Sequence, residues 1–189
     1  FKSAADHVRR LHRYRSATPE DHRRLIEALT RRKEWTQAAR EVHAYQTAHP
    51  KDAIPFLILR LKASQGDKKA TISEIENLLN RASEPTAILP IVSTLSGTPL
   101  EYLGEDLLIS TLGIEPNEPS IWLALLNVLE RRGAETLHKR LLGDLLDQFP
   151  EEGQFLFLKA QSHRDQRRYK LAAEALRRAI LLDPLNLDY

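Results

Sequence analysis

The 189-residue sequence contains no cysteine and no methionine, and it contains only 7 glycines. A chain without cysteine forms no disulfide, uses no thiolate nucleophile and binds no zinc through sulfur. So few glycines argue against an all-β protein, because many tight turns depend on glycine. No apolar run approaches the roughly 20 residues of a membrane-spanning helix. We therefore expect no membrane contact within this chain.

The residues that are present favour a folded, helical protein. Apolar residues make up 42% and charged residues 29% of the chain, which is typical of globular domains rather than of disordered segments. Leucine, alanine, arginine and glutamate dominate, and these residues favour α-helix. Because the chain opens at Phe1 and contains no methionine, we interpret it as an internal piece of a longer protein with flanking domains.

The charge is distributed unevenly. Residues 1–40 hold 11 basic and 5 acidic side chains, whereas the other 149 residues hold 17 basic and 21 acidic side chains. A basic end can meet nucleic acid or another polyanion. The alternative is that arginine covers the solvent side of helices. Nucleic acid is the less favoured partner, because the segment lacks the interleaved aromatic and basic residues of single-strand stacking surfaces.

The stretch from Leu156 to Pro184 has the pattern of a helix–turn–helix unit. The small residues Ala160 and Ala172 allow two antiparallel backbones to approach closely. Proline at the end of the stretch stops the second helix, because proline cannot continue it. The key positions are Ala160, Tyr169, Ala172, Leu176, Ala179 and Pro184.

This pattern recurs every 33 or 34 residues along the chain. The unit ends fall at Ser16, Pro50, Ser83, Pro116, Pro150 and Pro184. Aliphatic residues expected between the two helices of each pair, here called seam residues, recur with the same spacing. They are Val8, Val42, Ile75, Leu108, Leu142 and Leu176. Six aliphatic residues in one register are improbable by chance in a chain with 42% apolar residues. The repeat predicts an all-α array of stacked helical hairpins.

The repeat also predicts the organisation of the chain. The third repeat is the most irregular, because Pro90 lies inside its first helix and should bend it. Gly104 takes the small-residue position that Ala172 holds in the last repeat. The predicted segments are 1–18 (the second helix of a truncated repeat), 19–51, 52–84, 85–117, 118–151, and 152–189 (the fifth repeat and the start of another).

These spacings and residue types resemble the tetratricopeptide repeat family over essentially the whole chain. The resemblance implies a right-handed superhelix of antiparallel helix pairs, an α-solenoid. The sequence departs from the family pattern at His138, which replaces a small alanine, and at four bulky residues that replace glycine or alanine. Those four are Ile26, Leu59, Val92 and Leu126. Half-a-tetratricopeptide, pentatricopeptide and generic helical repeats are the alternatives.

The resemblance further implies a concave face, lined by the first helices, that binds peptides. Its apolar side chains would form a floor and its polar side chains would act as hooks for an amphipathic or extended segment. The alternative is that its aromatic and leucine residues belong to the core between repeats. The implied positions are Arg23, Glu27, Phe56, Arg60, Leu89, Ser93, Leu123, Asn127, Phe157 and Gln161. The family's lysine and asparagine clamp for a C-terminal carboxylate is not matched.

No pattern in the sequence predicts catalysis, a cofactor or a metal site. His7 and His12 are five positions apart, which does not place two ligands on one helical face. Glycine-rich phosphate loops, HExxH and GxSxG are missing. The paired acids Glu151 and Glu152 stand at a helix start, where the helix dipole accounts for them. We therefore expect a protein that is not an enzyme.

The sequence thus predicts an interaction scaffold that binds a peptide segment or a domain of a protein partner. Its long, Arg/Leu-rich array resembles bacterial repeat proteins. One such group comprises the periplasmic superhelices of outer-membrane exopolysaccharide export machines, which recruit polymer-modifying enzymes, and this resemblance favours the periplasm. The alternatives are a cytoplasmic assembly or regulatory adaptor, polyanion binding through the basic N-terminal segment, and a spacer between flanking domains.

Overall fold

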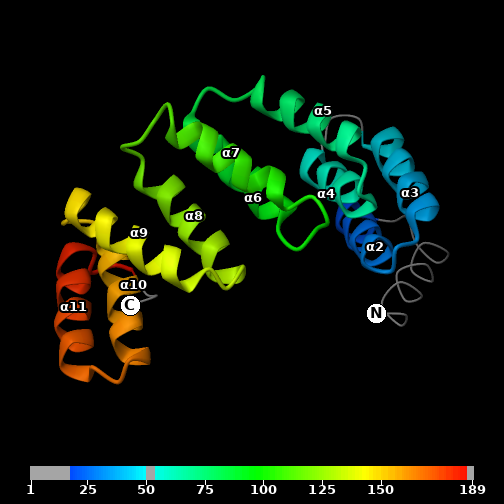
Figure 1. Ribbon diagram of the computed structural model, residues 1–189. Coiled ribbons are helices and arrows are strands. Elements are labelled where there is room, and N and C mark those ends of the chain that lie inside the picture. The colour runs from blue at the N-terminus through cyan, green and yellow to red at the C-terminus, as the bar shows by residue number, and fades with distance from the viewer. Residues whose placement is uncertain (1–17, 50–53, 187–189) are drawn as a thin grey trace. The chain divides into compact units, whose positions relative to one another are not determined.

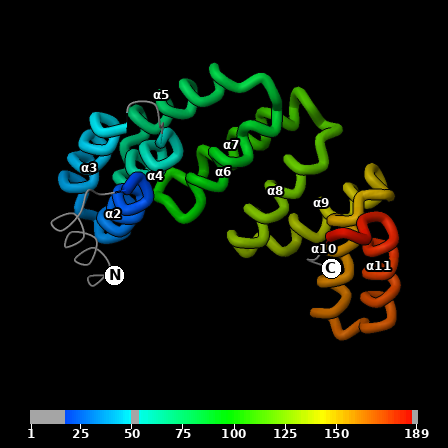
Figure 2. Tube along the Cα trace, turned by 180° about the vertical axis from the view of Figure 1, so that it is seen from behind, coloured from blue at the N-terminus to red at the C-terminus, as the bar shows by residue number. Residues whose placement is uncertain are grey.

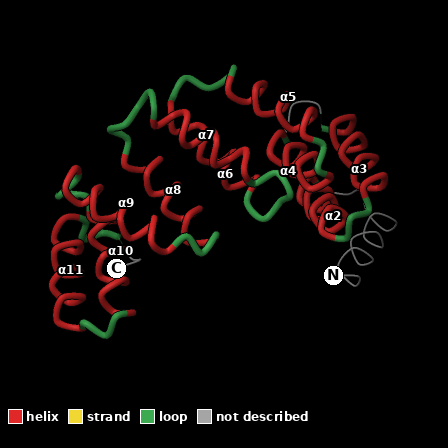
Figure 3. Tube along the Cα trace, viewed as in Figure 1, coloured by secondary structure: helices red, strands yellow, loops and turns green. Residues whose placement is uncertain are grey.

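The computed structural model describes residues 18–49 and 54–186, which form helices joined by turns (Figures 1 and 3). Within these ranges there is no strand, so the all-α prediction is confirmed for them. The predicted helix over residues 4–14 lies outside the described residues. The chain divides into two compact units, one up to Leu107 and one from Leu108.

The described part of the first unit contains two helical hairpins before residue 80. The first pairs α2 (Pro19–Arg31) with α3 (Trp35–Ala48), and the second pairs α4 (Pro55–Gln65) with α5 (Lys68–Leu79). Helix α4 packs against both α2 and α3, and it lies beside them in both views (Figures 1 and 2). The buried core that these helices share is Leu25, Ile26, Leu29, Ala38, Val42, Tyr45, Ile54 and Leu61.

The third predicted repeat differs from its expected form. A short 3-10 turn (Pro85–Ala87) precedes α6 (Ile88–Leu95), and α7 (Tyr102–Leu112) follows. Pro90 therefore lies in the first turn of α6, where its missing N–H has no intrahelical partner to lose. The helix type changes from 3-10 to α before Ile88, so Pro90 is the third residue of the α-helix.

Gly104 provides the close approach that its position in the repeat predicts. A Cβ atom added to this buried glycine would lie 3.5 Å from the Cα atom of Val92 on α6. The backbones of α6 and α7 therefore come close at this point. Leucines of the α6–α7 connection and of α7 complete an apolar cluster with α4, α5 and α6. Its buried members are Leu59, Ala63, Ile75, Ile91, Leu95, Leu100 and Leu103.

The second unit contains two further hairpins. Helix α8 (Pro119–Arg131) pairs with α9 (Glu135–Gln148), and α10 (Gly153–Asp165) pairs with α11 (Tyr169–Leu182). Helix α10 also packs against α9, so the hairpins contact each other within this unit. The buried centre is formed by Leu126, Leu142, Leu145 and Phe155. No described helix in either unit has both the length and the apolarity that crossing a membrane would require.

One turn geometry recurs in both units. A residue one or two positions after the first helix of a pair is left-handed, with φ of 59° at Lys33, 77° at Gly66, 70° at Gly133 and 59° at Arg167. In each case the next N–H donates back to a carbonyl five residues earlier, as from Glu34 to Leu29 (3.0 Å). This is the Schellman end of a helix. The hairpins therefore share a turn as well as a sequence pattern.

Candidate functional site

All ten residues of the predicted concave face lie on the first helices of the pairs, namely α2, α4, α6, α8 and α10. The structure brings several of them together in one groove within each unit. Arg23, Glu27 and Phe56 line a groove in the first unit. Leu123, Asn127, Phe157 and Gln161 line a groove in the second unit.

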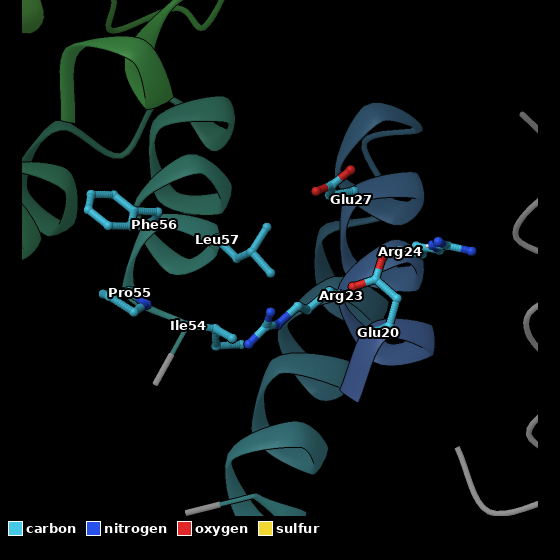
Figure 4. A pocket seen from close by; sticks show the side chains of 8 residues that line it. All are labelled: Glu20, Arg23, Arg24, Glu27, Ile54, Pro55, Phe56 and Leu57. Atoms are coloured by element: carbon cyan, nitrogen blue, oxygen red, sulfur yellow. Dashed lines mark hydrogen bonds and ion pairs between the residues drawn. The ribbon is translucent and has the colours of Figure 1, made fainter. Parts of the chain in front are cut away.

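The groove of the first unit, here called the charged groove, lies between α2 and α4 and has a volume of about 450 Å³. Figure 4 shows Leu57 extending from α4 toward α2, and Arg23 extending from α2 toward Ile54. The side chain that faces α2 most directly is therefore Leu57 rather than the predicted Phe56. The lining residues are Glu20, Arg23, Arg24, Glu27, Ile54, Pro55, Phe56 and Leu57.

Ion pairs and hydrogen bonds hold the charged wall of this groove. The Arg24 Nε atom is 2.9 Å from a Glu20 carboxylate oxygen, one helical turn away. The Arg23 guanidinium donates to the Tyr45 hydroxyl (3.4 Å) and lies 6.0 Å from the centre of that ring. Two arginines and two glutamates line the groove, so its formal charge is balanced.

The groove of the second unit, here called the amide groove, lies between α8 and α10 and has a volume of about 390 Å³. Its floor is apolar, and its polar side chains are mostly amides, which both donate and accept hydrogen bonds. Asn186, in the segment after α11, reaches the same groove. The lining residues are Leu123, Asn127, Glu130, Gln154, Phe157, Leu158, Gln161 and Asn186.

The remaining predicted residues do not line either groove. The Arg60 guanidinium donates to the backbone carbonyl of Thr94 (3.2 Å), so it joins α4 to the last turn of α6. Leu89 is half-buried and Ser93 is exposed, both on α6. Arg60 therefore has a structural contact whether or not it also meets a ligand.

Helical spacing would have identified some of the groove residues that the sequence analysis missed. Glu20 lies three positions before Arg23, and Gln154 lies three positions before Phe157. Residues at this spacing share one face of a helix. Asn186 could not be found in this way, because only the path of the chain after α11 brings it to the groove.

A separate polar cluster lies between α2 and α3. The Nδ1 atom of His22 is 2.5 Å from a carboxylate oxygen of Glu41, and both side chains are largely buried. The His22 ring packs edge-on against Tyr45 and His49, with centroid distances of 5.6 and 5.9 Å. These contacts join the start of α2 to the end of α3. Within residues 18–49 and 54–186 there is no group of three or more acids and histidines placed to hold a metal ion.

The chain was compared with protein families and with curated proteins. No protein-family model matches the chain, and a search of curated proteins finds no match either.

Proposed function

We propose that this chain is a non-catalytic protein-interaction scaffold built from tetratricopeptide-type repeats. Its hairpins stack into a right-handed superhelix, and the grooves between successive first helices bind a segment of a protein partner. The observation that carries the proposal is that corresponding helix pairs form a groove in both units. Seven of the groove residues stand at positions that the family resemblance assigns to ligand contact, namely Arg23, Glu27, Phe56, Leu123, Asn127, Phe157 and Gln161.

The recurrent hairpin supports the stacked arrangement. Each unit contains hairpins with the same left-handed turn residue, and in each unit one hairpin packs on the next. The seam residues Val42, Ile75 and Leu142 are buried, as side chains covered by a neighbouring helix should be. Repeats of this kind bury a continuous core only by stacking.

The grooves have the chemistry of peptide-binding surfaces. Each combines an apolar floor with polar side chains that can meet a peptide backbone, and each has a volume of several hundred Å³. Such surfaces suit an extended or amphipathic helical segment. Recruitment of partners to a bacterial exopolysaccharide export complex in the periplasm is a further proposal, supported only by the resemblance in composition and length.

A peptide-display experiment tests the proposed function. A library of random 12-residue peptides is selected on the 189-residue chain, and the enriched peptides are measured by calorimetry against a Phe56→Ala, Leu123→Ala and Phe157→Ala triple variant. We expect the triple variant to lose about tenfold or more in affinity while keeping its helical circular dichroism, because apolar anchors dominate such interfaces.

A matched triple variant controls for the loss of exposed apolar surface. Ile109→Ala, Ile114→Ala and Leu181→Ala remove three exposed side chains that line neither groove. This control should bind like the parent chain. The proposal is wrong if no peptide is enriched, or if both triple variants bind the enriched peptides as tightly as the parent does.

A further inference from the structure

Helix α11 carries a row of apolar side chains that its hairpin partner α10 leaves largely exposed. The row consists of Tyr169, Ala173, Leu176 and Ile180, and we call it the α11 stripe. These residues are four, three and four positions apart, which aligns them on one face of the helix. Tyr169 and Ile180 are 65% and 43% exposed. Within residues 18–49 and 54–186, α10 is the helix that packs extensively on α11.

The corresponding positions are covered in helices on which another helix stacks. Leu142 and Leu146 of α9 correspond to Leu176 and Ile180, and they pack in the cluster to which α10 contributes Phe155. The equivalent residues of α5 pack in a cluster with α6, and they are Ile75 and Leu79. The α11 stripe therefore continues the interface through which these helices stack, but no described helix covers it as α10 covers α9.

Two cations flank the α11 stripe. Lys170 and Arg177 each follow a stripe residue by one position, so they lie along the same edge of it. Both are exposed, and neither has an ion-pair partner among the described residues. Glu174 is the only acid of α11, against three basic residues. The residues of α9 that correspond to this edge are uncharged, namely Thr136 and Gly143, so the stacking of α10 on α9 uses no such charges.

We propose that the α11 stripe binds an amphipathic helix of a protein partner, whose apolar row is flanked by glutamate or aspartate. The apolar row covers the stripe as α10 covers α9. The acids lie beside Lys170 and Arg177, and charge complementarity selects them over neutral or basic side chains. A second copy of this chain would present another basic α11 and lacks this complementarity. The inference goes beyond the proposed function, because no stripe residue lines either groove.

Three acetylated and amidated helical peptides of 18 residues test this inference. They share an alanine-rich sequence with four leucines at the spacing of the stripe, and they differ only in four flanking positions, which are all glutamate, all glutamine or all lysine. Binding to the 189-residue chain is measured by fluorescence polarisation at low salt. We expect the glutamate peptide to bind about tenfold more tightly than the lysine peptide, as for closely placed charge pairs at an interface.

A charge-matched pair of variants assigns this preference to the edge of the stripe. Lys170→Gln with Arg177→Gln should reduce the glutamate preference to about twofold or less. Arg140→Gln with Arg178→Gln makes the same change in net charge at exposed positions outside this edge, on α9 and on another face of α11, and should retain the preference.

A second pair of variants tests the apolar row. Tyr169→Ala with Ile180→Ala should weaken binding of the glutamate peptide about tenfold, because apolar anchors dominate such interfaces. Both side chains are exposed, so the helical circular dichroism should not change. Ile109→Ala with Ile114→Ala removes exposed apolar side chains outside the stripe and should bind as the parent chain does.

The inference is overturned if the glutamate and lysine peptides bind equally, if the preference survives without Lys170 and Arg177, or if no peptide binds. It is also overturned if analytical ultracentrifugation shows a dimer that the Tyr169 and Ile180 variant loses, because the occupant is then a second copy. The triple groove variant separates the inference from the proposed function. It should bind the glutamate peptide as the parent does; if it loses this peptide, the peptide lies in a groove, and the inference fails while the proposed function stands.

Discussion

The hairpin of α2 and α3 and the hairpin of α8 and α9 have the same helix bounds, displaced by one hundred positions. Their buried positions correspond closely: Ile26 matches Leu126, and Val42 matches Leu142. Their groove positions do not correspond, because the first hairpin has Arg23 and Glu27 where the second has Leu123 and Asn127. Side chains at the seam therefore maintain the hairpin, while the groove positions are free to change chemistry.

The ends of the two hairpins differ as well. Helix α2 begins with a capping box formed by Thr18 and Asp21, whereas α8 has no side-chain cap at Glu118. The shared left-handed turn position is Lys33 in one hairpin and Gly133 in the other. The same fold is thus reached with different local contributions, and each difference can be tested by substitution.

The largest effect should come from the shared buried position. Ile26 and Leu126 are 1% and 0% exposed, so Ile26→Ala and Leu126→Ala should each reduce the free energy of unfolding by about 2–5 kcal/mol. The lost burial and the cavity left behind both contribute. Urea unfolding followed by circular dichroism measures the change.

Exchanging the two side chains provides the control. Ile26→Leu and Leu126→Ile keep volume and apolarity, so each should cost less than about 1.5 kcal/mol. If the alanine variants cost no more than these exchanges, the two positions do not hold equivalent seams, and the comparison between the hairpins fails.

The shared turn should give the next largest effect. At Gly133 an added Cβ meets no heavy atom within 4 Å, but the φ of +70° is unfavourable for an L-residue, so Gly133→Ala should destabilise the chain by about 1–2 kcal/mol. Lys33→Gly should act in the opposite direction. Differential scanning calorimetry compares the two. A stabilising Gly133→Ala substitution would contradict the left-handed assignment of this turn.

The sequence predicted the hairpins because their seam residues repeat in one register, as Val42 and Leu142 do. It did not predict the left-handed turn at Lys33 or Arg167, since neither residue is glycine, the residue type that usually marks such a turn. The predicted ligand-contact positions in the grooves were implied by the resemblance to tetratricopeptide repeats and not by the repeat spacing itself. Leu57 and Asn186 were missed because their place depends on how one element meets another, which a one-dimensional pattern does not contain.

The capping difference should have an effect of about 1 kcal/mol. In α2 the Thr18 hydroxyl oxygen accepts from the Asp21 N–H (3.2 Å), and an Asp21 carboxylate oxygen accepts from the Thr18 N–H (3.0 Å). Thr18→Ala removes the first bond and should reduce the free energy of unfolding by about 0.5–2 kcal/mol. Glu118→Ala should have a much smaller effect, because no cap is lost. Equal losses in urea unfolding would show that the Thr18 cap does not stabilise α2.

The smallest predicted effect lies in the middle of the second helix of each hairpin, where His43 of α3 corresponds to Gly143 of α9. Glycine inside a helix is less favourable than alanine because its unfolded backbone has more freedom to lose. An added Cβ at Gly143 meets no heavy atom within 4 Å, so Gly143→Ala should raise the free energy of unfolding by about 0.5–1 kcal/mol. Urea unfolding measures this gain, and peptide affinity should not change, because Gly143 lines neither groove. A loss of stability would mean that another part of the protein packs closely on this face of α9.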